Sequence, residues 1–69
     1  MPVESVIMRQ LIRLRQKRNI RPSEVARRMG VARQSIYNTE TMRQGYPNIR
    51  TLERYAKAIG AEIVVREKG

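Results

Sequence analysis

The stretch that decides the fold is residues 22–40, PSEVARRMGVARQSIYNTE. Pro22 suits the first position of a helix, because the backbone N–H that it lacks would have no helical partner there. Gly30 suits the left-handed turn that ends a helix. The pattern therefore predicts two short helices, over 22–29 and 33–41, joined by a tight turn.

Three small or apolar side chains predict how these two helices meet. Ala26 is small where the second helix would cross the first, and we expect Val31 and Ile36 to fill the angle between them. Two helices joined in this way form a helix-turn-helix motif, whose second helix inserts its N-terminal residues into the DNA major groove.

The second helix begins with long hydrogen-bonding side chains. We expect Arg33, Gln34 and Asn38 on its exposed face, with Ala32 and Tyr37 beside them. Arginine can bond guanine, glutamine and asparagine can bond adenine, and alanine can touch the thymine methyl group. Each residue alone is equally compatible with a solvated surface, but the basic residues around the face favour contact with DNA.

Apolar spacing predicts a longer helix on each side of this motif. The first covers residues 3–18 and ends before Asn19; the other covers residues 49–59 and begins after Asn48, a favourable N-cap. We expect their inward faces to consist of Val3, Ile7, Leu11 and Leu14 in the first helix and of Ile49, Leu52, Ala56 and Ile59 in the other.

The end of the sequence has a different pattern. Residues 61–66, AEIVVR, are rich in β-branched side chains and predict a short β-strand. A single strand needs a partner. Because no other segment offers one, we expect Ile63, Val64 and Val65 to pair antiparallel with the same strand of a second copy across a two-fold axis. A frayed tail is the alternative.

The net charge points to a polyanionic partner. The 69 residues, enough for a single domain, contain 15 basic and six acidic residues, giving a net charge of +9. Twelve of the basic residues are arginine, which bonds phosphate and guanine in a bidentate way. A small domain this basic is expected to bind nucleic acid.

The composition also argues against other classes of function. The chain contains no cysteine, histidine or aspartate, so we expect no catalytic site, no metal site and no cofactor. No apolar run is long enough to span a bilayer, and the N-terminus lacks the pattern of a signal peptide. We therefore expect no membrane association and a cytoplasmic protein.

Residues 11–60 resemble the Cro/repressor helix-turn-helix family, also called the XRE type. The resemblance rests on three segments: LIRLRQKRNI, PSEVARRMGVARQSIYNTE and PNIRTLERYAKAIG. It implies a mainly α-helical, four-helix fold of the lambda-repressor type. It also implies a buried ion pair between Arg15 and Glu40 that joins the first helix to the recognition helix.

The resemblance further implies which residues contact DNA. Bases are assigned to the exposed face of the recognition helix, and phosphates to the start of the preceding helix and to the loop after the recognition helix. The expected phosphate contacts are Arg21, Ser23, Ser35, Thr41, Arg43, Gln44 and Tyr46. The sequence departs from the family at four positions: Arg21 and Ala32 replace capping residues, Pro22 replaces a glutamine that commonly binds phosphate, and Thr39 replaces an apolar residue.

These features predict a homodimeric, Cro-like repressor that binds a palindromic operator. The C-terminal segment AEIVVRE resembles the ending of Cro proteins and also that of some DNA-binding antitoxins, and it replaces the fifth helix that is common in the family. An antitoxin that binds a toxin and represses its own operon is therefore the alternative.

Overall fold

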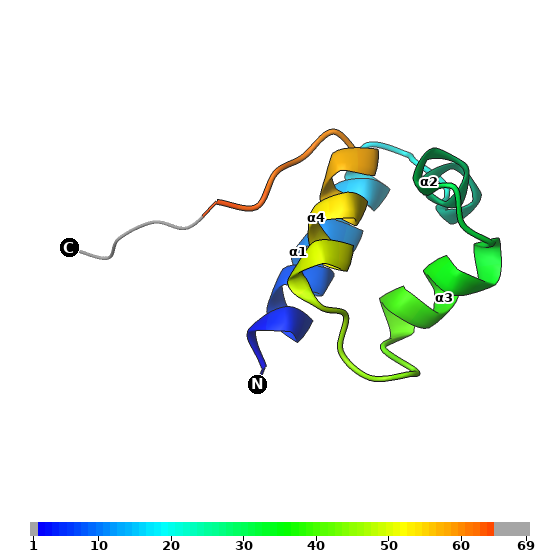
Figure 1. Ribbon diagram of the computed structural model, residues 1–69. Coiled ribbons are helices and arrows are strands. Elements are labelled where there is room, and N and C mark those ends of the chain that lie inside the picture. Colours follow the sequence, from blue (N-terminus) through cyan, green and yellow to red (C-terminus); the bar gives the residue numbers. More distant parts are fainter. Residues whose placement is uncertain (1, 65–69) are drawn as a thin grey trace.

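Four helices make up most of the computed structural model, which describes residues 2–64. Helix α1 spans Val3–Lys17, α2 spans Pro22–Met29, α3 spans Arg33–Thr41 and α4 spans Ile49–Ala58. Helices α1 and α4 pack side by side, and the pair α2 and α3 packs against them (Figure 1). This confirms the expected four-helix, mainly α-helical fold, although α1 and α4 each end one residue earlier than predicted.

All four helices stop in the same way. Each is followed by a residue in the left-handed region, at φ 56°, 68°, 55° and 75° for Asn19, Gly30, Met42 and Gly60. The next N–H returns to a carbonyl five residues back, as from Ile20 to Arg15 at 3.1 Å, which is the Schellman arrangement. Met42 was not expected there, because a side chain in this conformation costs about 1–2 kcal/mol.

The helix starts differ from one another. The Asn48 side chain accepts a hydrogen bond from the Thr51 backbone N–H at 2.9 Å, so the predicted cap of α4 is confirmed. Helices α2 and α3 begin at Arg21 and Ala32 without a side-chain cap. The side chains of Arg21 and Ala32 therefore accept no hydrogen bond from the first N–H groups of α2 and α3.

The core lies where the four helices meet. Its buried hydrophobic residues are Met8, Leu11, Val25, Ala26, Ile36, Leu52, Tyr55, Ala56, Ala58 and Ile59. The sequence pattern predicts Leu11, Ile36, Leu52, Ala56 and Ile59 correctly. Met8 and Tyr55 were not predicted, although both lie at helical spacing from predicted core residues.

The predicted inward face of α1 is partly right. Leu11 is buried and Ile7 and Leu14 pack partly buried against the core, whereas Val3 is 64% exposed. The most buried line of this helix is Ser5, Met8, Leu11 and Arg15, which apolar spacing could not indicate because two of its members are polar. The buried line is the one that contains Arg15, because this residue reaches a partner inside the protein.

Two further residues expected in the core lie at the surface. Ile49 is 54% exposed because it is the first residue of α4 and projects beyond the core. Val31 is 38% exposed, since its position directly after the left-handed Gly30 places its side chain outside the angle between α2 and α3. Ile36, 1% exposed, fills that angle instead.

The predicted C-terminal strand is not formed by residues 61–64 in the single chain. Ile63 packs partly buried against the core, while Val64 is 62% exposed. No other described segment lies beside this stretch as a second strand. Val65 and Arg66 lie outside the described residues, so the strand and its pairing between copies stay predictions.

A cluster of three polar side chains, Arg15, Glu40 and Tyr55, joins α1, α3 and α4. The Nε of Arg15 donates to Glu40 Oε2 at 2.9 Å and to the Tyr55 hydroxyl at 3.0 Å. Its Nη1 donates to the Ile20 carbonyl at 2.9 Å, in the turn before α2. The side chains of Arg15 and Glu40 are only 10% and 14% exposed. This polar cluster therefore ties α3 to the rest of the protein.

The protonation of Tyr55 suits its place in the polar cluster. Burial, followed by the hydrogen bond to Glu40, raises the pKa of the Tyr55 hydroxyl well above its usual range. The hydroxyl therefore keeps its proton and donates it to the Glu40 carboxylate.

Replacing a member of the polar cluster is expected to destabilise the fold. Glu40→Ala leaves the Arg15 charge buried without a partner, which costs about 3–5 kcal/mol. Tyr55→Phe removes only a hydroxyl bonded to charged groups and is expected to cost about 1.5–3 kcal/mol. Urea denaturation followed by circular dichroism measures both values.

The matched control is Glu24→Ala, which removes a carboxylate from an exposed set of ion pairs on α2. Exposed pairs contribute little to stability, so this variant is expected to unfold almost like the wild type. Equal effects of Glu40→Ala and Glu24→Ala would contradict the role given to the polar cluster.

Candidate nucleic-acid interface

Helix α3 presents a face of hydrogen-bonding side chains to solvent. Ala32, Arg33, Gln34 and Tyr37 are exposed and Asn38 is half-buried. Only Ile36 of this helix is buried. The five residues predicted to contact bases therefore lie together at the surface, along the first half of α3.

Two of these side chains bond each other. Gln34 Nε2 donates to Asn38 Oδ1 at 3.1 Å. The residues are four apart on a helix, so their side chains lie one above the other. This bond was not predicted, although an amide side chain four residues before another on a helix is a signal for it.

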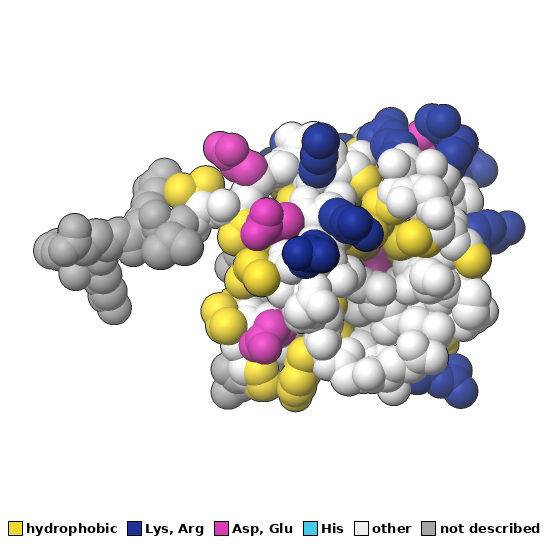
Figure 2. Space-filling model, in the orientation of Figure 1, with side chains coloured by type: hydrophobic (Ala, Val, Ile, Leu, Met, Phe, Trp, Pro, Cys, Tyr) yellow, Lys and Arg dark blue, Asp and Glu magenta, His cyan; other side chains and the backbone are white. Residues whose placement is uncertain are grey.

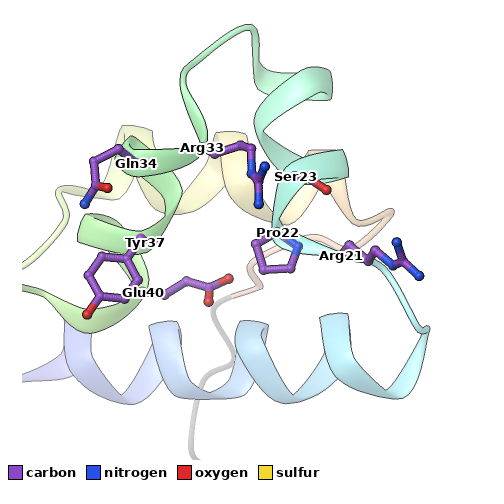
Figure 3. A pocket seen from close by; sticks show the side chains of 7 residues that line it. All are labelled: Arg21, Pro22, Ser23, Arg33, Gln34, Tyr37 and Glu40. Carbon is purple, nitrogen blue, oxygen red and sulfur yellow. The ribbon is translucent and has the colours of Figure 1, made fainter.

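An open hollow lies between α3 and the start of α2. Its volume is about 750 Å³. Arg33 points from α3 toward Pro22 at the start of α2, and Ser23 and Tyr37 line the hollow on either side (Figure 3). Arg21, Gln34 and Glu40 complete its lining. The structure thus brings two of the predicted phosphate contacts next to predicted base contacts.

The start of α2 keeps donors that can face an anion. Pro22 has no N–H, and the N–H groups of Glu24 and Val25 both bond the Arg21 carbonyl. The backbone N–H and hydroxyl of Ser23 and the guanidinium of Arg21 remain beside the hollow. These groups replace the side-chain amide that Pro22 cannot supply.

The loop after α3 folds back alongside this helix. Gln44 and Tyr46 line a second hollow together with Ser35 and Asn38. Tyr46 is 57% exposed, and Arg43 is also exposed. The loop therefore brings Gln44 and Tyr46, two more of the predicted phosphate contacts, beside α3.

Thr39 and Thr41 are used within the helix. Their hydroxyls donate to the carbonyls of Ser35 and Tyr37, both at 2.8 Å. Such bonds to the preceding turn satisfy a threonine inside a helix. A phosphate has no proton to give, so Thr41 can bond one only after its hydroxyl rotates away from Tyr37.

The charged side chains are unevenly distributed. Basic side chains crowd the edge formed by α2, whereas acidic ones lie mainly toward the side from which the C-terminal segment extends (Figure 2). Glu24 bonds Arg27 and Arg28, and the hydrogen bond from Arg27 lowers the pKa of the Glu24 carboxyl below its usual range. Arg28 also donates to the Ala58 carbonyl at 2.7 Å, and Arg18 donates to that of Ile59, at the end of α4.

Other kinds of site find little support in the part of the chain that the structure describes. Residues 2–64 contain no group of three or more side chains placed to hold a metal ion. Over the same residues, no helix combines the length and the apolar character needed to cross a bilayer.

Comparison with known proteins identifies the family. A family model described as a helix-turn-helix domain matches residues 8–68, which include all of α2, α3 and α4 and most of α1. No curated protein and no solved structure matches the chain significantly. Because the family match covers most of the chain and the geometry of α2 and α3 agrees with it, the chain belongs to the helix-turn-helix domain family.

Proposed function

We propose that this protein is a sequence-specific DNA-binding transcriptional regulator of the Cro/repressor type. It would be encoded by a prokaryote or a phage and act in the cytoplasm. The observation that carries the proposal is the exposed polar face of α3. Ile36 and the polar cluster hold this helix in place, and the protein has a net charge of +9. Helix-turn-helix domains bind DNA by placing the second helix of the motif in the major groove.

The proposed base contacts are the exposed residues of α3. Arg33 suits guanine O6 and N7, while Gln34 and Asn38 offer amide groups to base edges. Ala32, directly before α3, and Tyr37, three residues after Gln34, add a methyl group and a ring that can touch thymine methyls or the sugar backbone.

The proposed phosphate contacts surround this face. Arg21 and Ser23 lie beside the hollow at the start of α2, and Arg43, Gln44 and Tyr46 lie on the loop after α3. The uncapped start of α3 offers additional N–H groups, which favour anions through their positive partial charge. Phosphate contacts fix the position of a protein on DNA and leave sequence discrimination to the base contacts.

We further propose that the protein acts as a homodimer. The exposed Val64 and the partly buried Ile63 give the C-terminal segment an apolar surface that a second copy could cover, with Val65 extending the strand. Two recognition helices related by a two-fold axis would read half-sites about 34 Å apart in a palindromic operator. Occupation of such a site would block RNA polymerase and repress transcription.

The same C-terminal segment also suits a toxin as partner. An exposed apolar segment can pair with another protein as well as with its own copy. In that second function the chain is an antitoxin that represses its own operon. A toxin gene immediately beside the gene for this chain would favour the antitoxin.

Selection from random double-stranded DNA at physiological salt tests the function directly. The wild type is expected to enrich a two-fold symmetric site, and the Gln34→Ala/Asn38→Ala double variant is expected not to. If the wild type enriches no sequence and its binding only fades with salt, the charge provides non-specific affinity alone.

Gln34→Ala is expected to weaken binding to the selected operator by about 1–3 kcal/mol and to change binding to random DNA little, because base contacts provide specificity. Fluorescence anisotropy with both DNAs measures the two losses. Gln10→Ala on α1 is the control and should match the wild type. Equal losses for Gln34→Ala on both DNAs would remove this residue from the base contacts.

Arg43→Ala is expected to weaken binding to every sequence and to flatten the dependence of log K on log salt by about one unit, because a phosphate contact releases about one counterion. The control is Arg54→Ala, because Arg54 is not among the proposed phosphate contacts. It lies in α4, beside Lys57 and Gly60. A salt dependence identical to that of the wild type would show that Arg43 does not touch phosphate.

Val64→Asp is expected to weaken self-association several-fold without loss of helix, because it places like charges opposite each other in a two-fold strand pair. Sedimentation equilibrium measures the association, and Val31→Asp is the control at another exposed valine. A wild type that stays monomeric at all concentrations, or a Val64→Asp variant that dimerises normally, would refute the proposed interface.

A further inference from the structure

The hydrogen bond between Gln34 and Asn38 restricts what each amide can offer to DNA. A free amide side chain can turn either its oxygen or its NH₂ group toward a base. Here the Asn38 oxygen accepts from Gln34 at 3.1 Å, so it points along the helix toward Gln34. The bond thus selects one orientation for each amide.

The restricted Asn38 side chain is left with donors. Its oxygen is engaged, and its NH₂ group keeps two N–H bonds for another partner. In the major groove, guanine presents the acceptors N7 and O6, and thymine presents O4. Cytosine presents only an amino group there, which meets the Asn38 NH₂ group donor against donor, and adenine presents one acceptor, N7, beside an amino donor. Guanine and thymine present acceptors without a donor and therefore suit the Asn38 NH₂ group best.

Gln34 keeps one acceptor and one donor side by side. Only one N–H of its amide is engaged with Asn38, so its oxygen and its second N–H remain free for DNA. Adenine is the base that matches both, because it offers an N6 amino donor beside the N7 acceptor. Guanine has no donor at its major-groove edge and would leave the Gln34 oxygen unbonded.

The spacing of the two residues places these bases close together. Four residues rise about 6 Å along a helix, and base pairs are stacked about 3.4 Å apart. The two contacted base pairs therefore lie within about two steps of each other in one half-site.

We propose that Gln34 and Asn38 read DNA as one coupled amide pair, and that each operator half-site holds an adenine at Gln34 with a guanine or thymine at Asn38. This inference rests on the DNA-binding function proposed above. It adds a base pattern that follows from the direction of a single hydrogen bond.

The decisive experiment is selection from random double-stranded DNA with the wild type and with Asn38→Asp. The carboxylate can still accept from Gln34, but it offers DNA acceptors where asparagine offered donors. We expect the variant to keep adenine at the first position and to change the second preference from guanine or thymine to cytosine or adenine. Each preference is expected to be about 5- to 150-fold, the range for a good base contact.

Two controls separate the coupled pair from simpler effects. Gln10→Glu on α1 carries the same change of charge and is expected to keep the wild-type site. Replacing the selected adenine by 7-deazaadenine removes its N7 acceptor, and this should weaken binding of the wild type but not that of Gln34→Ala. Circular dichroism checks that each variant keeps its helices.

The outcomes distinguish this inference from the function on which it rests. A wild type that enriches no site overturns both. A wild type that enriches a symmetric site without adenine and a nearby guanine or thymine overturns the coupled pair alone. If the Asn38→Asp variant keeps the preference for guanine or thymine at the second position, the coupled pair is also overturned. A changed second preference together with retained adenine supports it.

Discussion

The contact between Arg15 and Glu40 is the interaction on which the arrangement of α3 depends. Helix α3 has nine residues and buries one apolar side chain, Ile36, and so short a helix is marginal by itself in water. Its hold on the body therefore comes from the Glu40 carboxylate, which Arg15 and Tyr55 both bond. A partly buried ion pair adds little net stability, but it allows one geometry only. The same contact therefore fixes the orientation of the exposed face of α3.

The sequence was informative wherever backbone chemistry dictates the local structure. Pro22, Gly30 and Asn48 predict the helix boundaries, because the conformation of each is limited or its side chain caps a helix. The inward face of α1 was predicted only in part, because its buried line includes the polar residues Ser5 and Arg15, whose burial depends on contacts with other parts of the fold. Tyr55 and Met42 were missed for a related reason: their roles depend on partners or conformations set by the complete fold. The C-terminal strand was predicted from β-branched side chains and an expected second copy, and residues 61–64 form no strand in the single chain.

The basic residues do not all have the same task. Arg18 and Arg28 donate to carbonyls at the end of α4, where the helix dipole is negative. Arg28 also shares Glu24 with Arg27. Arg15 lies inside the protein. The arginines that face the hollow beside α3, Arg21 and Arg33, remain available for DNA. The net charge of +9 is therefore larger than the charge available to phosphate in the proposed interface. The positions of the basic residues matter more for this interface than their number.

The repeated left-handed stops after the helices have a consequence for how quickly the protein reaches its active form. They make the connections short, so most contacts join residues that are close in the sequence. Helical proteins with such local contacts fold within microseconds to milliseconds. Folding of this chain is then far faster than its synthesis, which proceeds at roughly 5–20 residues per second. The amount of folded chain therefore follows the rate of translation without delay, and any lag before the proposed dimer acts comes from its concentration-dependent assembly.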